Sequence, residues 1–451
     1  MADNIEAGIH HFTGKKDYIP PENPNVSKHL EWFMGLKLGF MMHWSPATQL
    51  GLTESWPLSD GDADWSQYEI DWTDDMDKFR AQYWALNKTF NPIRFQPKKI
   101  AKVAKESGFK YVLFTTKHHD GFCMFDTKQT DYKITATDCP FSTHEYANIT
   151  KALFDAFRAE DMAVSAYFSK PDWHCDFYWH RAFGTAKSRN MNYDIKEHPE
   201  LWEKFVQFTH RQIEEITSDY GKVDVLWLDG GQVAPRNEGQ DIRLGEVVEK
   251  IRSSTQPHLI VCDRTVGGKY ENIVTPEQTI PSKPLNIPWE SCVTLGKNFS
   301  FHYDDEYKSA FEIVHILLDI VSKGGSLALN VTLRPDGAVP NQALAMLSKL
   351  GQWLSIHGEG IYNSTSAHIE PHHTGILYTK VDERIYAFFK YMEIPHLPKK
   401  IYLCNSPSVE SVRLIRTNQL LPFVRNGDWI IVDTSDVSMV GAELAEGFVM
   451  C

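Results

Sequence analysis

The chain has 451 residues, more than one small core requires, so we expect two domains. Its apolar content of 42% and aromatic content of 12% predict a large buried interior and exclude an intrinsically disordered protein. The formal net charge of −13 comes without any basic block, which argues against nucleic acid or an anionic membrane surface as a partner.

Targeting and cross-linking signals are sparse. The seven cysteines are odd in number and scattered without a CxxC pair, so we expect neither a disulfide framework nor a structural zinc site. No apolar run reaches the ~18 residues that span a bilayer, and residues 1–24 lack the apolar core of a signal peptide. We expect a periplasmic or secreted protein if a signal peptide has been removed, and a cytoplasmic one otherwise. The oligomeric state stays unknown.

Apolar runs alternate with amphipathic segments over the first 360 residues. Six runs are typical of strands buried on both faces, at 36–44, 111–119, 163–169, 223–229, 259–264 and 326–331. Helical patterns lie between most of them, at 97–108, 200–216 and 306–325 among others. This alternation predicts a parallel sheet, and its length favours a (β/α)8-like barrel over an open doubly wound sheet. The first strand lacks the glycine fingerprint that the open sheet would need. Only six strands can be placed from the sequence, so the predicted barrel could be irregular in its remaining strands.

The pattern changes after the helical segment at 341–362. Short alternating runs follow, at 374–381, 384–391, 399–405, 411–415 and 429–434, with turns between them. They predict a small all-β sandwich. We therefore divide the chain into a barrel domain over residues 1–360 and a β-sandwich domain over residues 361–451.

The segment VLWLDGG, residues 225–231, ends a buried strand with a carboxylate. Active sites of barrels lie at the carboxyl ends of the strands. Asp229 could simply cap the next helix, but Trp227 shares its strand face, and the two glycines let a ligand approach the backbone. A carboxylate beside an indole suits the nucleophile and sugar platform of a glycosidase.

Two further features allow more than one interpretation. His118 and His119 could ligate a metal, yet neighbours on a regular strand point to opposite faces, and both reach one site only where the strand breaks. The same donors can bind a polyhydroxylated ligand without a metal. A glycosidase also needs a second carboxyl group, and the loop 264–291 offers Glu271, Glu277 and Glu290.

Several segments carry a family resemblance: KLGFMMHW, ESWPLS, YVLFTTKHHDGFCMFDT, AYFSKPDW, VDVLWLDGG, TPEQTIP, PWESC, GGSLALNVTLRPDGAV and LGQWLSIHGEGIY. Through them the chain resembles the glycoside hydrolase family 29 α-L-fucosidases over nearly its whole length. The resemblance implies a retaining α-L-fucosidase, with Asp229 as nucleophile and Glu277 of TPE as acid/base, Glu290 being the second choice. It implies no metal or organic cofactor, and a fucosylated oligosaccharide or glycoconjugate as substrate.

The resemblance also implies the residues that bind the sugar. They are His43, Glu54, Trp56, His118, His119, Tyr167, Trp227, Arg264, Glu290 and Phe301. The chain departs from the family at Ser45, where glycine is usual, and at Ser300–Tyr303, where the family has SWGY. A metal-dependent barrel hydrolase and a non-catalytic fucose-binding protein are the alternatives.

Overall fold

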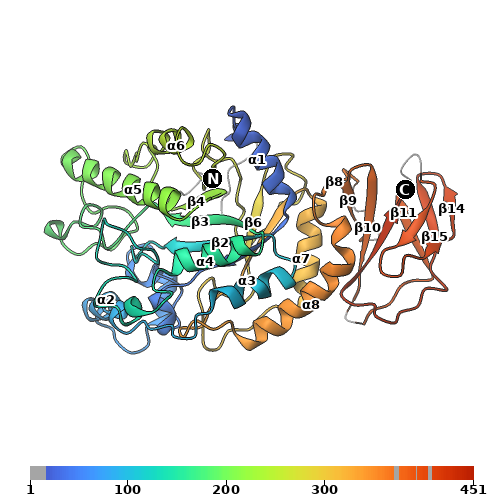
Figure 1. Ribbon diagram of the computed structural model, residues 1–451, viewed down its shortest axis with the longest axis horizontal. Coiled ribbons are helices and arrows are strands. Elements are labelled where there is room, and N and C mark those ends of the chain that lie inside the picture. The colour runs from blue at the N-terminus through green and yellow to red at the C-terminus, as the bar shows by residue number, and fades with distance from the viewer. Residues whose placement is uncertain (1–16, 370–374, 393, 405–408) are drawn as a thin grey trace.

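The computed structural model describes residues 17–369, 375–392, 394–404 and 409–451 (Figure 1). Seven parallel strands form one curled sheet in the order β5-β4-β3-β2-β1-β7-β6. Their bounds are β1 Leu38–Met42, β2 Tyr111–Lys117, β3 Ala163–Ser169, β4 Val225–Asp229, β5 Ile260–Asp263, β6 Glu290–Thr294 and β7 Ser326–Asn330. Nearly all of their residues are buried, as expected of parallel strands that side chains cover on both faces.

Helices surround this sheet, and most of them cover its outer face, as Figure 1 shows. They are α1 Pro24–Gly35, α2 Met76–Trp84, α3 Pro97–Glu106, α4 Ile149–Ala159, α5 Pro199–Asp219, α6 Leu244–Arg252, α7 Ala310–Ser322 and α8 Asn341–His357. Single 3-10 turns are η2 Pro46–Gln49, η3 Trp56–Leu58, η4 Asp64–Glu69, η5 Leu86–Lys88, η6 Pro140–Thr143, η7 Arg181–Phe183 and η8 Gly358–Gly360. The predicted helices at 97–108, 200–216 and 306–325 are confirmed as α3, α5 and α7. Helix α7 begins later than predicted because Ser309 and Glu312 form a capping box there.

The barrel closes through an irregular segment. β5 and β6 are the two ends of the sheet order, and residues 271–278 fill the space between them. The Asn272 amide donates to the Val261 carbonyl at 2.8 Å, and the Glu290 amide donates to the Val274 carbonyl at 2.9 Å. The sequence pattern predicted a loop over residues 264–291 and did not indicate β6, which begins at the end of this range. Its sequence ESCVT has only two apolar residues, so no apolar run marks it.

The C-terminal part is all β, as predicted. A six-stranded sheet has the order β13-β12-β16-β10-β9-β8, and a three-stranded sheet has the order β11-β15-β14. The bounds are β8 Thr365–Ser366, β9 Leu377–Val381, β10 Arg384–Lys390, β11 Lys400–Cys404, β12 Val412–Leu414, β13 Leu420–Leu421, β14 Phe423–Asn426, β15 Trp429–Asp433 and β16 Ala445–Met450. The sequence analysis missed β8, β13, β14 and β16.

The β-sheets pack against the barrel through α7 and α8. The Trp353 indole donates to the Ala445 carbonyl at 2.9 Å, and a ring nitrogen of His315 lies 3.0 Å from the Leu444 carbonyl. Further from the barrel, the β-sheets enclose a core of their own, which includes Leu403, Ile430 and Phe448. Because this second core lies within the C-terminal strands, we propose to keep the domain division at residue 360.

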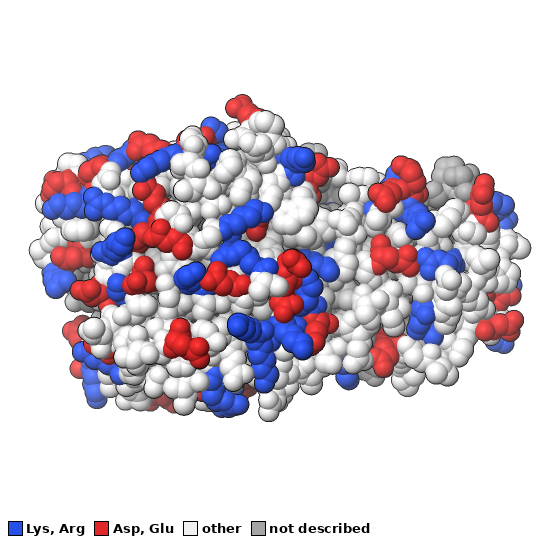
Figure 2. All heavy atoms as spheres, viewed as in Figure 1, with Lys and Arg blue, Asp and Glu red and all other residues white. Residues whose placement is uncertain are grey.

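Surface charge is mixed on the face shown in Figure 2, where lysine and arginine alternate with aspartate and glutamate. Among the described residues, no helix has an apolar stretch long enough to cross a bilayer.

Candidate active site

A cavity of about 400 Å³ opens at the carboxyl ends of the barrel strands. Most of the predicted site residues line it, although they come from widely separated segments of the chain. The predicted residues in its lining are His43, Glu54, Trp56, His118, His119, Tyr167, Trp227, Asp229, Arg264 and Glu277. The strand ends therefore converge on one pocket, as parallel strands of a barrel must.

Asp229 ends β4 and is held by three groups. The Tyr167 hydroxyl donates to its Oδ2 at 2.5 Å, the Arg264 guanidinium donates to its Oδ1 at 3.0 Å, and His119 Nε2 lies 3.8 Å away. Burial would raise the pKa of Asp229, but the Arg264 charge, the His119 ring and the Tyr167 hydrogen bond together hold this pKa well below its usual range. The carboxylate is thus ionised and fixed in orientation.

Arg264 joins Asp229 to the second predicted carboxylate. Its Nη1 donates to Asp229, and its Nη2 donates to Glu277. The guanidinium also lies 4.8 Å from the centre of the Trp227 ring. Burial would lower the pKa of Arg264, but the charges of Glu277 and Asp229 raise it, so the arginine stays charged. One buried cation therefore holds both carboxylates at the same side of the pocket.

His118 and His119 both line the pocket because β2 ends at Lys117, one residue before them. The pairing of β2 with β3 also shifts register between Thr115 and Lys117. This is the strand break that the sequence analysis required for the two rings to share a site, and their centres lie 4.3 Å apart.

Serine hydroxyls orient the two rings. Ser55 Oγ lies 2.7 Å from Nδ1 of His118, and Ser169 Oγ lies 2.8 Å from Nδ1 of His119. Burial lowers the pKa of His118 to about 4 and places the pKa of His119 well below its usual range. Both rings are neutral near pH 7, and each keeps its Nε2 for a ligand.

Burial also lowers the pKa of His43, aided by the nearby His118. Its Nδ1 is buried without a partner among the described residues. A neutral ring with an unsatisfied nitrogen is suited to a hydroxyl group of a ligand.

Glu54 and Trp56 form another part of the pocket wall. Burial, with the neighbouring Glu69 and Glu277, raises the pKa of Glu54 well above its usual range. Trp56 meets His119 edge-on, with 5.0 Å between ring centres, and Trp65 lies 6.0 Å beyond it. This side of the pocket combines a buried carboxyl group with flat apolar surfaces.

Glu290 is outside the pocket lining, contrary to its placement among the sugar-binding residues. It begins β6 inside the barrel, 2% exposed, where Tyr111 donates to one oxygen and the Trp227 indole donates to the other at 3.2 Å. Burial raises the pKa of Glu290 to about 7. Because it is the first residue of its strand, it lies below the rim, under the Trp227 side chain.

Phe301 also lies outside the pocket lining, and Phe299 lines the pocket instead. Phe301 is buried and packs on Tyr303, with 5.1 Å between ring centres. Phe299 lies 5.2 Å from the His43 ring, and its carbonyl accepts from Asn330 at 2.8 Å. The segment bends at these residues, so the chain does not present alternate side chains as a strand would.

Sequence reasoning missed several lining residues. They are Met41, Thr53, Trp65, Gln232, Thr265, Thr275, Gln278, Cys292, Lys297, Asn298 and Phe299, whereas the lining residues Gly230 and Gly231 are the two glycines singled out after Asp229. Position after a strand could have identified Gln232 and Thr265, because they follow β4 and β5. Trp65 lies on η4, away from any strand end, and no sequence pattern marks it.

Two carboxylates bridged by an arginine, among indoles and neutral histidines at a barrel rim, fit the paired carboxyl groups of a glycoside hydrolase. The sequence profile of the family described as Alpha-L-fucosidase matches residues 10–359. The chain therefore belongs to the α-L-fucosidase family, as the sequence analysis inferred from its motifs.

Individual relatives agree with this assignment. The chain is 24% identical to an α-L-fucosidase of Dictyostelium discoideum over an alignment of 382 positions, which covers 79% of this chain and 77% of that protein. Its fold is similar to α-L-fucosidase isoenzyme 1 from Paenibacillus thiaminolyticus, with a TM-score of 0.77, 27% identity and coverage of 94% and 99% of the two chains. A family 29 α-L-fucosidase of Bacteroides thetaiotaomicron has a similar fold too, with a TM-score of 0.76, 22% identity and coverage of 97% and 98%.

Proposed function

We propose that this enzyme is a retaining α-L-fucosidase that releases terminal α-L-fucose from oligosaccharides or glycoconjugates. Asp229 is the nucleophile and Glu277 the acid/base. The observation that carries the proposal is the Arg264 guanidinium, which contacts both carboxylates at once. A shared guanidinium suits carboxyl groups about 5–5.5 Å apart, as in retaining enzymes, better than the ~6.5–9.5 Å of inverting ones.

The reaction runs in two displacements. Asp229, kept ionised by Arg264 and Tyr167, attacks the anomeric carbon while Glu277 gives its proton to the departing glycosidic oxygen. The carboxylate of Glu277 then takes a proton from water, and the water oxygen displaces Asp229 to release fucose. The similar Bacteroides enzyme was solved as a trapped covalent intermediate in complex with 2-fluoro-fucosyl fluoride, which supports the same sequence of steps here.

Glu277 has to reach the glycosidic oxygen in the first step, whereas in this structure its carboxyl group contacts Arg264. We propose that sugar binding opens the Glu277–Arg264 contact and turns Glu277 toward the leaving group. Arg264 keeps its bonds to Asp229 and to Thr275 Oγ1, the latter at 3.3 Å, so it stays in place when Glu277 leaves.

Recognition of the sugar rests on neutral donors and apolar walls. His43, His118 and His119 offer ring nitrogens to hydroxyl groups without the cost of burying extra charge. The indole of Trp227 and the ring of Phe299 line the same cavity and supply an apolar surface for the C5 methyl group of fucose. Phe299 takes the part that the sequence analysis gave to Phe301.

The test uses an aryl α-L-fucoside with the wild type, Asp229→Ala and Glu277→Ala. Asp229→Ala should be inactive. Glu277→Ala should form the glycosyl-enzyme from an activated aryl leaving group but turn over only with azide. Glu246→Ala is the control, because Glu246 is an exposed glutamate on α6, outside the pocket lining. Wild-type turnover in Glu277→Ala would refute the acid/base assignment.

A metal-dependent hydrolase is the second candidate. Ligand atoms of His118, His119 and Asp229 lie within 4.8 Å of one another. The Arg264 cation already occupies one side of Asp229, which disfavours a second cation there. Chelator treatment distinguishes the two functions, because activity lost on chelation and restored by Zn²⁺ would refute the fucosidase mechanism above.

A further inference from the structure

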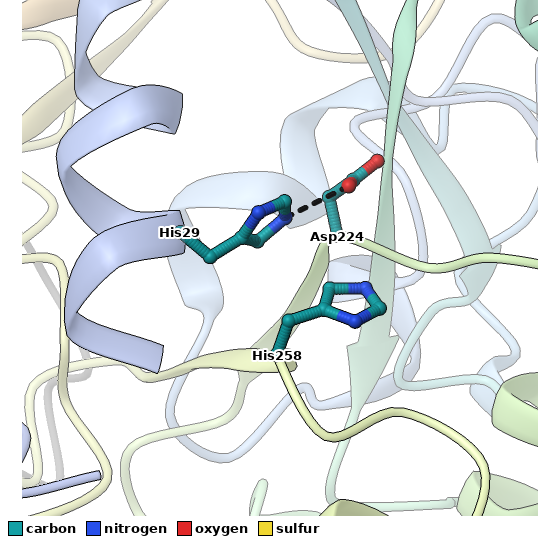
Figure 3. Close-up of side chains that lie close together, drawn as sticks. All are labelled: His29, Asp224 and His258. Atoms are coloured by element: carbon teal, nitrogen blue, oxygen red, sulfur yellow. Dashed lines mark hydrogen bonds and ion pairs between the residues drawn. The ribbon is translucent and has the colours of Figure 1, made fainter. Parts of the chain in front are cut away.

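A second group of histidine and aspartate side chains lies at the end of the barrel opposite the pocket. His29 comes from α1, Asp224 immediately precedes β4, and His258 precedes β5 by two residues. Figure 3 shows the three side chains converging from these separate elements. One ligand atom of each lies within 4.8 Å of the other two. The cluster plays no part in the chemistry proposed above.

Asp224 anchors the cluster. Its Oδ2 accepts from the Val164 amide at 2.8 Å, which fixes the carboxylate plane. Its Oδ1 lies 2.9 Å from His29 Nε2 and 2.6 Å from the Lys222 ammonium. The Asp224 side chain is only 4% exposed, whereas the Lys222 side chain is 50% exposed. The oxygen that faces the two histidines is therefore buried, and one half-exposed surface cation neutralises it.

His258 supplies an unused ring nitrogen. The Val223 backbone accepts a hydrogen bond from the His258 ring, and His258 Nε2 is buried without a partner among the described residues. Donation from Nδ1 leaves a lone pair on Nε2, on the side of Asp224 in Figure 3. Metal-binding histidines commonly give their other N–H to a backbone carbonyl in this way, which fixes the ring and its tautomer.

We propose that His29 Nε2, Asp224 Oδ1 and His258 Nε2 form a binding site for a divalent transition-metal ion of the Zn²⁺ type. Two imidazoles and one carboxylate suit such an ion, with bonds of about 2.0–2.2 Å and a water as fourth ligand. The ion inserts between donors that already converge and displaces Lys222 from Asp224. Because its ligands come from α1 and from the starts of β4 and β5, the bound ion cross-links the base of the barrel and stabilises the fold.

The experiment measures Zn²⁺ binding to chelator-treated full-length protein by equilibrium dialysis, with thermal unfolding scans at each concentration. All proteins carry Asp229→Ala, which removes the histidine–aspartate cluster of the pocket. We expect one Zn²⁺ per chain and a melting temperature that rises with Zn²⁺ concentration. His258→Gln should weaken binding by about tenfold or more, and Lys222→Met should strengthen it because the competing cation is gone.

The matched control is His315→Gln, a half-buried histidine on α7 that bonds the Leu444 carbonyl and should leave Zn²⁺ binding unchanged. Equal binding by the parent and His258→Gln, or no binding at micromolar Zn²⁺, would overturn the proposal. If His258→Gln fails to fold, Lys222→Met decides alone, since unchanged or weaker binding in that variant contradicts the site. Fucosidase activity of the wild type is expected to be independent of this ion, so either result leaves the proposed function untouched.

Discussion

Replacement of Glu290 by glutamine tests how the barrel interior supports the pocket. Tyr111 and Trp227 each donate to this carboxyl group, and burial raises its pKa from 4.5 to about 7. Glutamine has the same shape: its oxygen accepts from the Trp227 indole, and its amide donates to the Tyr111 oxygen. Glu290→Gln thus imitates the protonated carboxyl group at every pH.

The expected effect on stability follows from this raised pKa. Below about pH 4.5 the carboxyl group is protonated in both the folded and the unfolded chain, so it does not lower the free energy of unfolding. As the pH rises to 7, the Glu290 carboxyl group ionises readily in the unfolded chain but not in the folded chain. The free energy of unfolding of the wild type therefore falls by about 3 kcal/mol. Glu290→Gln escapes this loss. Its stability relative to the wild type should therefore increase between pH 5 and pH 8 by about 2–3 kcal/mol.

The assay is denaturant or thermal unfolding of both proteins at several pH values, because the pH dependence of all other groups cancels in the difference. Activity on an aryl α-L-fucoside should stay within about tenfold of the wild type, since Glu290 does not line the pocket. A difference that is flat with pH would refute the raised pKa. Complete loss of activity in a folded variant would restore Glu290 as the acid/base candidate.

Three further predictions address the nucleophile, the packing and the thiols. Tyr167→Phe removes the 2.5 Å hydrogen bond to Asp229 and should lower kcat/KM by about 10- to 100-fold, with an unchanged melting temperature; a wild-type rate would show that Tyr167 does not position the nucleophile. Gly39→Ala would place a Cβ 2.1 Å from the Tyr111 ring, and calorimetry should show a loss of at least about 1–3 kcal/mol. Because all seven cysteines are free thiols, dithiothreitol should not change the melting temperature, and a large decrease would reveal a disulfide.

The sequence predicted most of the pocket because chemistry at a barrel rim is tied to strand ends. Asp229, Arg264 and the histidine pair directly follow or end apolar runs that are easy to recognise, and the fold requires such ends to meet. Trp227 was placed beside Asp229 by the two-residue period of a strand. These inferences depend only on local pattern and on the architecture, so they hold without knowledge of any loop.

Residues on irregular segments could not be predicted in this way. Phe299 and Phe301 differ by two positions, and only the bend between them decides which ring enters the pocket. Trp65 reaches the site from η4 through its packing near Trp56, a tertiary contact that no spacing encodes. The family resemblance assigned the aromatic wall to Phe301 because motifs are matched by position along the chain. A side chain lines the cavity only if it points into it.

The segment that closes the barrel also carries Glu277, the proposed acid/base. Residues 271–278 stand where another parallel strand would pair with β5 and β6, and Glu277 belongs to this segment. The Cys292 amide donates to the Pro276 carbonyl at 3.1 Å, and the Gln278 amide donates to the Cys292 carbonyl at 2.9 Å. Backbone bonds on both sides of Glu277 therefore hold its Cα at the rim, where its side chain contacts Arg264. A regular strand would fix that side chain as firmly as Asp229, and a free loop would not keep it beside Arg264. We propose that an irregular closing segment suits an acid/base at Glu277, because in the proposed mechanism this side chain leaves Arg264 for the leaving group and then reaches the incoming water.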